Sequence, residues 1–392
     1  MSKNKFKTLN LFCFLLVFSL LFSPIFSPLF AQNAIEVHLA GATNGDVFDY
    51  ASVMSEPRAY TGGPESYASL TQDQIKNMKL YTGGIPFGVK FMTEGILIVG
   101  FCDIASGNKS VNPSQSAGLK EGDRIISVDG CEIFSSLDLI KRIEQSEGKA
   151  LSIVYLRGSD RRTTSLRPVY CEKEQCYKSG LYVKDNGAGI GTVTYIDPKT
   201  LSFGGLGHGI CDAQSGELVP IQRGSIVNVS INGAIKGQSG APGEVKGSFR
   251  SGKIGTLTKN TGCGVYGVYA SLPQGLPTEP LSLCPKSELR EGKAYIYCTL
   301  DDSGPQKYEI EISRINRGST EGKSFTVKVA DPKLIEKTGG IVQGMSGSPI
   351  IQNGRLAGAV THVLINDPTT GYGIFIENML NAANTQVMPK AA

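Results

Sequence analysis

The chain has 392 residues, of which 40% are hydrophobic and 19% charged, and its formal net charge at pH 7 is +4. This length predicts two domains with packed cores, and the small, unclustered charge offers no support for nucleic acid as a partner. The 48 glycines, the absence of tryptophan and the few long helical patterns favour a mainly β chain with many turns.

Residues 1–34 have the pattern of an export segment. Three lysines among the first seven residues precede an uncharged run over residues 9–30, and small residues around Ala31 offer a cleavage point. The run is long enough to span a bilayer, although Pro24 and Pro28 interrupt it. We therefore expect export across the cytoplasmic membrane, with the segment either removed as a signal peptide or kept as a membrane anchor.

The cysteines do not define a metal site. One of the nine, Cys13, lies in the export segment, and an even number remains in the rest of the chain: Cys102, Cys131, Cys171, Cys176, Cys211, Cys263, Cys284 and Cys298. In an exported chain these thiols could form disulfides, but the sequence does not choose among the possible pairings. Buried free thiols are the alternative. No spacing matches a zinc knuckle, and we expect neither a metal nor a cofactor.

Residues 35–80 are polar and irregular, and we interpret them as a linker with one short helix near its end. Residues 81–168 then predict a small domain with a strand at 96–99 and a closing strand at 150–157. A helix is predicted from residue 136 to about residue 147. Its apolar residues recur at helical spacing and are expected to be buried: Leu137, Ile140 and Ile143.

From Ala117 the chain reads Ala-Gly-Leu-x-x-Gly-Asp-x-Ile-x-x-Val-Asp-Gly, a pattern specific to PDZ domains, and residues 81–168 resemble that family. The resemblance implies a groove in which a peptide adds as a strand beside the second helix, with its carboxylate held by a glycine-rich loop. That loop would consist of Gly84, Ile85, Pro86 and Phe87. Proline lacks an N–H donor, which favours an internal peptide segment. A PDZ fold kept only as a spacer is the alternative, and a chain without residues 81–168 is expected to keep its catalytic residues.

Near the C-terminus, the sequence Gly344-Met345-Ser346-Gly347-Ser348-Pro349-Ile350 precedes a strand–turn–strand pattern. Small neighbours leave a serine hydroxyl accessible and let backbone N–H groups turn towards an oxyanion. The pattern is typical of the nucleophile loop of chymotrypsin-like proteases, with Ser346 as nucleophile and the amides of Gly344 and Ser346 as oxyanion hole. An ordinary hairpin turn is the alternative.

The chain has three histidines from which to choose a general base. His38 lies in the irregular region after the export segment. His362 follows the candidate nucleophile closely in sequence, so we expect it to line the substrate cleft or pack in the core. His208 lies in the glycine-rich turn 203–210 after two predicted strands, which would hold an imidazole at a barrel rim. We therefore predict His208 as the base.

Asp185, which precedes His208, Asp212 and Asp331 are positioned to supply the acid that orients the imidazole, and the choice lies between the last two. Asp212 lies four residues after His208, and Asp331 ends a predicted strand at 324–330, where Pro332 stops it. The local sequence does not decide between them.

An export segment, a PDZ domain and the motifs Gly-Leu-Gly-His and Gly-Met-Ser-Gly-Ser-Pro-Ile, in this order, resemble the SpoIVB peptidase family of endospore-forming bacteria. Residues 189–194, 205–210 and 359–368 carry the closest likeness. The resemblance implies a catalytic triad of His208, Asp331 and Ser346, and so favours Asp331 over Asp212. We expect a chymotrypsin-like double β-barrel serine peptidase domain in residues 169–392.

The resemblance also implies a role. Members of the family are exported from the forespore into the space between two membranes, process their own N-terminal region and act in sporulation signalling. Their target is the inhibitory subunit of an intramembrane metalloprotease complex, a protein substrate near the membrane. Two alternatives are a non-catalytic exported PDZ scaffold and a quality-control serine protease, a class that places its PDZ domains after the protease.

Overall fold

The computed structural model describes residues 53–61, 70–107, 109–212, 216–277 and 279–384. The predicted export segment, His38 and much of the predicted linker lie outside these residues. Within them, no helix has the length and apolar character needed to cross a bilayer. The described part is mainly β, as the composition predicts, and the short helix expected near the end of the linker is present as α2 (Gln72–Asn77).

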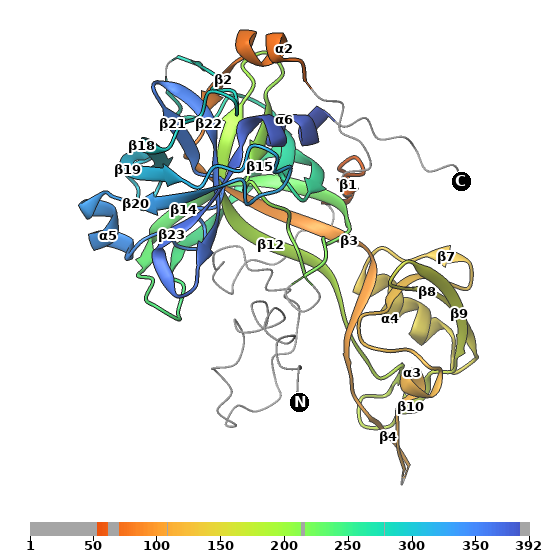
Figure 1. Ribbon diagram of the computed structural model, residues 1–392. Coiled ribbons are helices and arrows are strands. Elements are labelled where there is room, and N and C mark those ends of the chain that lie inside the picture. The colour runs from red at the N-terminus through yellow and green to blue at the C-terminus, as the bar shows by residue number, and fades with distance from the viewer. Residues whose placement is uncertain (1–52, 62–69, 108, 213–215, 278, 385–392) are drawn as a thin grey trace, which may run out of the picture. The chain divides into compact units, whose positions relative to one another are not determined.

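Six strands form the first barrel: β3 (Pro86–Phe101), β12 (Leu181–Ile196), β13 (Ser202–Gly205), β14 (Ile221–Ile235), β15 (Glu244–Thr261) and β16 (Gly264–Tyr269). Their order is β12-β13-β16-β15-β14-β3, and because β3 also pairs with β12 the sheet closes on itself (Figure 1). The interior is filled by large apolar side chains that are at most 1% exposed: Phe87, Phe91, Val193, Phe203 and Leu257.

A second closed barrel follows in the chain, with the strand order β18 (Gly292–Cys298), β19 (Gln306–Ser313), β20 (Phe325–Val329), β23 (Asp367–Phe375), β22 (Arg355–Leu364) and β21 (Pro349–Gln352). Its interior contains Ile296, Ile310, Val327, Ile350 and Phe375, none of which is exposed. Two six-stranded barrels are the chymotrypsin-like arrangement, so the predicted fold class is confirmed. The remaining elements are β1 (Tyr60–Thr61), β2 (Lys79–Thr82), β17 (Leu281–Ser282), α5 (Pro332–Thr338) and α6 (Ile376–Asn384).

The predicted PDZ domain is inserted into the first barrel, between β3 and β12. Both strands have 16 residues and run from the barrel into the inserted domain. Val89 pairs with Gly189 in the barrel, whereas Leu97 pairs with Lys184 in the inserted domain. The first barrel is therefore built from segments on both sides of the insertion.

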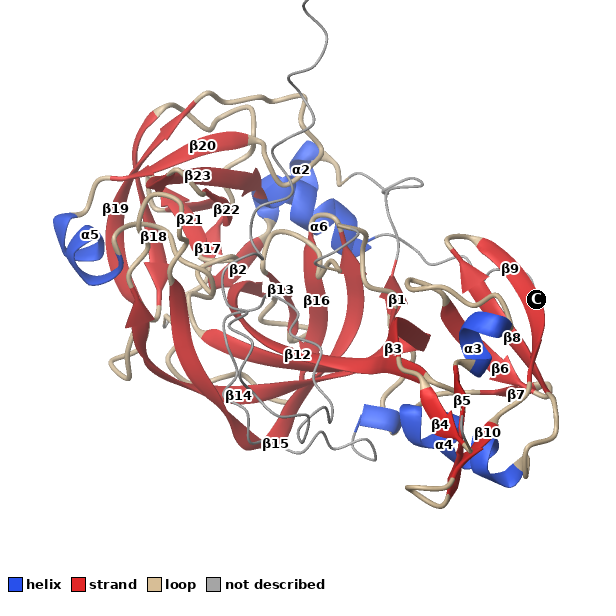
Figure 2. Ribbon diagram, turned by 90° about the horizontal axis from the view of Figure 1, so that it is seen from below, coloured by secondary structure: helices blue, strands red, loops and turns tan. Residues whose placement is uncertain are grey.

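The inserted domain comprises β4 (Ile104–Ser106), β5 (Lys109–Val111), α3 (Pro113–Ser116), β6 (Arg124–Val128), β7 (Cys131–Glu132), α4 (Ser136–Gln145), β8 (Leu151–Arg157), β9 (Asp160–Leu166), β10 (Val169–Cys171) and β11 (Cys176–Lys178). Figure 2 shows β6, β8 and β9 as neighbours in one sheet. Its core is separate from those of the barrels and includes Ile96, Ile125, Leu139 and Ile153.

The glycine-rich stretch before β3 belongs to the barrel. The N–H of Gly84 donates to the Val193 carbonyl at 2.8 Å, and Phe87 is fully buried. A Cβ atom on Gly84 would lie 2.9 Å from the Cβ of Tyr297 in the second barrel. The predicted peptide-binding loop of Gly84, Ile85, Pro86 and Phe87 is therefore wrong, because strand pairing and core packing already occupy this segment.

Helix α4 buries a different face from the one predicted. Leu139 and Ile143, four residues apart, are 3% and 5% exposed and pack into the domain core, whereas Leu137 and Ile140 are 60% and 49% exposed. A short helix on a small domain buries a single stripe, and the sequence contains two apolar stripes. The prediction was correct for Ile143 and wrong for the other two residues, which leave an apolar surface on the helix.

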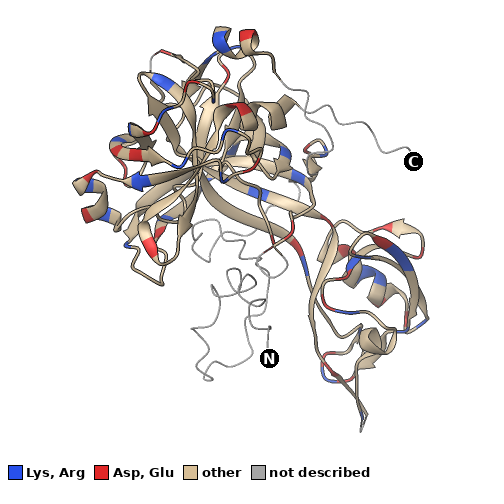
Figure 3. Ribbon diagram, in the orientation of Figure 1, with Lys and Arg blue, Asp and Glu red and all other residues tan. Residues whose placement is uncertain are grey.

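Charges of both signs are interspersed along the described chain (Figure 3). Arg157 on β8 forms a 2.7 Å ion pair with Asp123, whose side chain is 1% exposed. Asp123 also accepts a hydrogen bond from the Lys120 N–H. The aspartate of the Gly-Asp motif thus ties the loop before β6 to the neighbouring strand.

All the cysteines outside the export segment are free thiols in the structure. Burial raises the pKa of Cys284 and of Cys298, so these thiols have little reactive thiolate. Cys171 and Cys176 lie directly opposite each other across the hairpin of β10 and β11. Buried free thiols, the alternative to disulfides, describe Cys171, Cys263, Cys284 and Cys298.

Candidate active site

The loop that carries Ser346 precedes β21, and glycine is required at its turns. Gly344 and Gly347 have φ angles of 95° and 96°, which side chains other than glycine rarely adopt. A Cβ atom on Gly347 would lie 2.0 Å from the Thr192 carbonyl oxygen. The small residues in the motif therefore allow the loop to lie directly against a strand of the first barrel.

That strand is β12, and two of its threonines hold the loop. The Thr192 hydroxyl donates to the Gly344 carbonyl at 2.7 Å, and the Thr194 hydroxyl donates to the Gly347 carbonyl at 2.8 Å. The N–H of Thr192 also donates to the Ser346 carbonyl. From the sequence, this strand stands out only for its family likeness, and the role of the threonines is not evident. The sequence does contain a signal for this role, since Thr192 and Thr194 carry hydroxyl groups in a mostly apolar stretch.

Two backbone donors flank the nucleophile. The N–H groups of Met345, Gly347 and Ser348 donate to Val342, Val360 and Met345, respectively. In contrast, the N–H groups of Gly344 and Ser346 have no acceptor among the residues that the structure describes. Two free donors beside a serine are what an oxyanion hole requires, so the geometry is compatible with the predicted role.

The Ser346 hydroxyl is partly buried and donates a 2.6 Å hydrogen bond to the carbonyl of Thr361 on β22. The Thr361 hydroxyl in turn donates to the Gly322 carbonyl at 2.6 Å. The nucleophile candidate is therefore held by the adjacent strand, and its hydroxyl would have to rotate away from this carbonyl to reach an imidazole.

His208 lies in the tight turn after β13, where Leu206 and Gly207 both have positive φ angles. Its Nδ1 lies 2.9 Å from the Gly209 carbonyl oxygen. Because a carbonyl only accepts, Nδ1 carries the proton in this contact and Nε2 is left as the acceptor. Desolvation lowers the pKa of His208 and outweighs the opposing effect of the Gly209 hydrogen bond. The ring is therefore neutral at pH 7 and able to accept a proton.

In the structure, the imidazole rings of His362 and His208 are in contact. The two rings have centroids 4.9 Å apart and planes inclined by 36°, which is a tilted aromatic contact within the usual distance range. Since His362 follows Thr361 directly, one short segment of β22 contacts both the nucleophile candidate and the base candidate. The expectation that His362 lines the cleft or packs in the core does not include this contact.

The structure does not place Asp331 at His208. Asp331 is the N-cap of α5, where its carboxylate accepts hydrogen bonds from the N–H groups of Lys333 (2.9 Å) and Glu309 (3.2 Å). Aspartate followed by proline is a favourable helix start, so Pro332 begins a helix here as well as ending the predicted strand. The other candidate, Asp212, has its N–H bonded to the Glu217 carbonyl in a separate hairpin.

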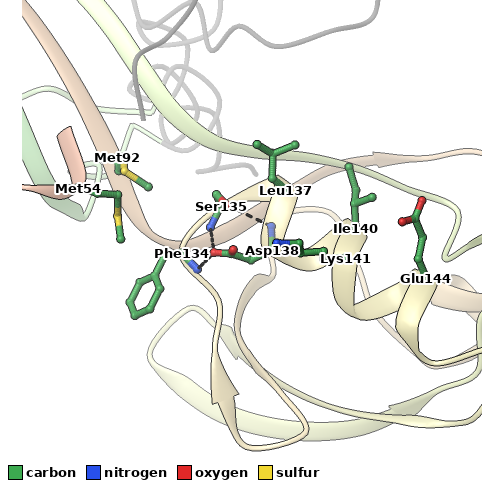
Figure 4. Close-up of a pocket in the computed structure, with 9 residues that line it drawn as sticks. All are labelled: Met54, Met92, Phe134, Ser135, Leu137, Asp138, Ile140, Lys141 and Glu144. Atoms are coloured by element: carbon green, nitrogen blue, oxygen red, sulfur yellow. Dashed lines mark hydrogen bonds between the residues drawn. The ribbon is translucent and has the colours of Figure 1, made fainter. Parts of the chain in front are cut away.

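A second candidate site is a hollow of about 480 Å³ on the exposed side of α4. Figure 4 shows Leu137, Ile140 and Glu144 projecting from the same side of the helix. The lining residues are Met54, Met92, Phe134, Ser135, Leu137, Asp138, Ile140, Lys141 and Glu144. Mainly apolar walls with a few charged groups at the edge suit an extended or helical peptide.

Comparison with known proteins gives two family matches. The model of the SpoIVB peptidase S55 family matches residues 175–380, and that of the PDZ domain matches residues 103–167. A curated relative, a putative zinc metalloprotease of Neisseria meningitidis serogroup A / serotype 4A, is 32% identical over 74 residues, which are 19% of this chain. The chain spans only 17% of the length of that relative.

Two solved structures are also similar. The PDZ domain of the SdrC-like protein from Listeria monocytogenes covers 23% of this chain and 87% of its own, at 20% identity and a TM-score of 0.19. An inactive serine-to-alanine mutant of Rv3671c from M. tuberculosis H37Rv covers 51% of this chain and 84% of its own, at 14% identity and a TM-score of 0.27.

Proposed function

The chain belongs to the SpoIVB peptidase S55 family and is therefore a PDZ-containing serine endopeptidase, and we propose that Ser346 is its nucleophile and His208 its general base. The observation that carries this proposal is the shared contact with β22. The Ser346 hydroxyl bonds to the carbonyl of Thr361, and the His208 ring packs on the next residue, His362. One segment of β22 thus contacts both candidate side chains, which come from different barrels.

The proposed mechanism uses the chain's own groups. The Ser346 hydroxyl turns from the Thr361 carbonyl and attacks the scissile carbonyl carbon, while Nε2 of His208 takes its proton. The N–H groups of Gly344 and Ser346 bind the oxyanion that forms. His208 then protonates the leaving amine, and water releases the acyl group by the same steps. The Gly209 carbonyl keeps the proton on Nδ1 in the resting enzyme.

This mechanism does not use Asp331, which leads to a prediction. Asparagine caps helices about as well as aspartate, but it keeps only one of the two oxygens that accept from Lys333 and Glu309, so Asp331→Asn should lower the melting temperature slightly and leave kcat close to the wild-type value. Asp331→Ala should lower the stability by about 1 kcal/mol, again with little change in kcat. Peptide hydrolysis and thermal melting of the two variants would be measured side by side. A loss of about 10⁴ in kcat for Asp331→Asn at unchanged stability is the result expected of a triad acid, and it would restore the role that the family resemblance implies.

We propose that protein substrates are held on the exposed face of α4. Leu137 and Ile140 are large apolar side chains that the domain leaves exposed, and Lys141 and Glu144 at the edge of the hollow can select the charges of a bound segment. The PDZ domain would then present a protein substrate to the barrels, whereas a short peptide would not need it.

We therefore expect Leu137→Ser combined with Ile140→Ser to weaken cleavage of a folded protein substrate about 10-fold or more, since contacts of this kind contribute about 1–2 kcal/mol each. Hydrolysis of a short soluble peptide should not change. Val268→Ser, an exposed apolar residue on the first barrel, is the matched control and should alter neither assay. Equal loss in both assays would show that this face supports the fold of the peptidase and does not hold the substrate.

The biological setting is also a proposal. The export pattern of residues 1–34 and the family membership support an enzyme that crosses the forespore membrane, processes its own N-terminal region and acts beside the membrane in sporulation signalling. Its partner would be the inhibitory subunit of an intramembrane metalloprotease complex. The test is to mix purified enzyme with vesicles that carry this complex. Cleavage of the subunit by the wild type but not by Ser346→Ala is expected, and an intact subunit in both reactions would refute this choice of substrate.

A further inference from the structure

We propose that Cys171 and Cys176 are the site of a reversible disulfide, which fastens the hairpin of β10 and β11 where it braces helix α4. The sequence leaves the pairing of the cysteines open, and the register of this hairpin selects one pair. Both residues are free thiols in the structure, which is the reduced form of the site. The inference does not depend on which residues catalyse peptide hydrolysis.

The first argument is the register of the hairpin. Cys171 on β10 and Cys176 on β11 are directly opposite partners. Opposite residues of an antiparallel pair have Cα atoms about 4.5–5.5 Å apart and side chains on the same face, and a disulfide needs a Cα separation of about 4.4–6.8 Å. The bond therefore forms without a shift of the strands. Among the residues that the structure describes, no other two cysteines are partners in a strand pairing.

The second argument is that side chains of this hairpin meet across the strands. Tyr170 and Tyr177 are the neighbouring opposite pair, and their ring centroids lie 5.2 Å apart in an edge-to-face contact. Cys171 is also among the groups that act electrostatically on Cys176, so the two thiols lie near each other. The hairpin thus has the alignment that an S–S bond requires.

The two thiols differ in their access to solvent, which gives the reaction an order. Cys176 is half-buried, whereas Cys171 is 5% exposed. The Cys176 thiolate attacks a sulfur of a small-molecule disulfide, such as oxidised glutathione, and one thiol leaves. The Cys171 thiolate then attacks the Cys176 sulfur of this mixed disulfide, and the second thiol leaves. The two cysteines lose two electrons to the oxidant, and their two protons end on the released thiols.

The predicted location of the enzyme suits such a bond. Disulfides form and persist outside the cytoplasm and are rare inside it, and residues 1–34 have the pattern of an export segment. Two other cysteines illustrate what this setting cannot reach. Cys284 and Cys298 are 2% and 1% exposed in the core of the second barrel, so an oxidant in solution has no access to them.

The bond has a structural consequence because the hairpin supports the end of α4. Gly148 lies just beyond the helix, and a Cβ atom there would lie 2.7 Å from Cε1 of Tyr177, so the tyrosine ring lies directly on the chain that leaves α4. Tyr177 also packs against the core of the inserted domain. A two-stranded hairpin is marginally stable alone, and a covalent link between its strands keeps Tyr177 in place.

Trypsin offers a direct test of the bond, because Lys173 lies between the two cysteines. The purified enzyme is treated with oxidised glutathione at mildly alkaline pH, since burial raises the pKa of Cys176, and is then alkylated and digested without reduction. Cleavage after Lys173 separates the cysteines unless a disulfide joins them. We expect peptides 163–173 and 174–178 as one linked species that dithiothreitol splits. Alkylation of both thiols after this treatment would overturn the proposal.

Hydrogen exchange tests the bracing of α4. We expect its amides to exchange about 10-fold faster in the dithiothreitol-reduced enzyme than in the oxidised enzyme, a size that a crosslink over a short loop can supply, while α6 in the peptidase part stays unchanged. Cys176→Ser should exchange at the reduced rate under both conditions. Cys131→Ser, at an exposed cysteine of the same domain, is the matched control and should behave as the wild type. A linked pair with equal α4 exchange in both forms would refute the bracing role.

A consequence for cleavage rests on the proposed function of the α4 face. If that face holds protein substrates, reduction should slow cleavage of a folded substrate and leave hydrolysis of a short peptide unchanged. The linked peptide and the exchange rates do not depend on this function. A bond that forms and slows α4 exchange without any effect on cleavage would therefore count against the substrate role of α4, and the absence of the linked peptide would count against the disulfide.

Discussion

Ser346→Ala should abolish peptide hydrolysis and any self-processing, with kcat falling by about 10⁴–10⁶. The physical reason is that the variant keeps the loop and its two free N–H donors but loses the oxygen that forms the acyl bond. Alanine fits the position without strain, so the melting temperature should stay near that of the wild type. The measurement is hydrolysis of a fluorogenic peptide by purified protein that lacks residues 1–34.

Ser348 provides the matched control two residues away. Its side chain is fully buried, and its hydroxyl donates to the Met345 carbonyl at 2.6 Å, so it cannot reach a substrate. A fluorophosphonate should therefore label Ser346 and leave Ser348 unmodified, as peptide mapping by mass spectrometry would reveal. If the Ser346→Ala variant retained more than a few per cent of the wild-type activity, Ser346 would be excluded as the nucleophile. Failure of the wild type to react with the probe would favour the non-catalytic scaffold.

Removal of residues 81–168 should unfold the peptidase, contrary to the expectation from the sequence that this deletion spares the catalytic part. The deletion removes the part of β3 that closes the first barrel, including Phe87, Val89 and Phe91, which are fully buried. Loss of one buried phenylalanine costs about 3–5 kcal/mol, and a domain has only about 5–15 kcal/mol of stability in total. Circular dichroism should show no cooperative melting of this variant.

A different excision should preserve the barrels. Met92 on β3 is paired with Asn186 on β12, so a short glycine-rich turn can join these two strands directly in place of residues 93–185. This variant keeps every strand of both barrels together with Ser346 and His208. We expect it to melt cooperatively and to hydrolyse a short peptide within a few-fold of the wild-type rate, but to cleave a folded protein substrate poorly.

The two deletions test the insertion directly. If the 81–168 deletion folded and the 93–185 excision did not, the boundary between domains would lie where the sequence placed it. If both folded and the second cleaved folded substrate at the normal rate, the PDZ domain would have no part in substrate capture. Together, the two deletions test where the domain boundary lies and, independently, whether the inserted domain captures substrate.

The sequence by itself determined the parts whose chemistry is local. The PDZ motif is readable because its Gly-Asp turn and the strand after it are neighbours in the chain, and Asp123 indeed ties that turn to Arg157. The loop of the candidate nucleophile is readable because its turns need glycine at specific positions around a serine, and Gly344 and Gly347 have positive φ angles there. In both cases, the residues that make the feature lie within one short segment.

The tertiary structure alone decided which distant segments meet. Periodicity along one strand does not tell which strand it pairs with, so β3 was assigned to the PDZ domain although its first half closes the first barrel. Asp331 was chosen by family resemblance, and only the fold reveals that it caps a helix. His362 lies 154 positions after His208 in the sequence, and no local pattern indicates that their rings touch. Pairing and packing between barrels depend on the closed sheets as a whole, which a single stretch of sequence does not encode.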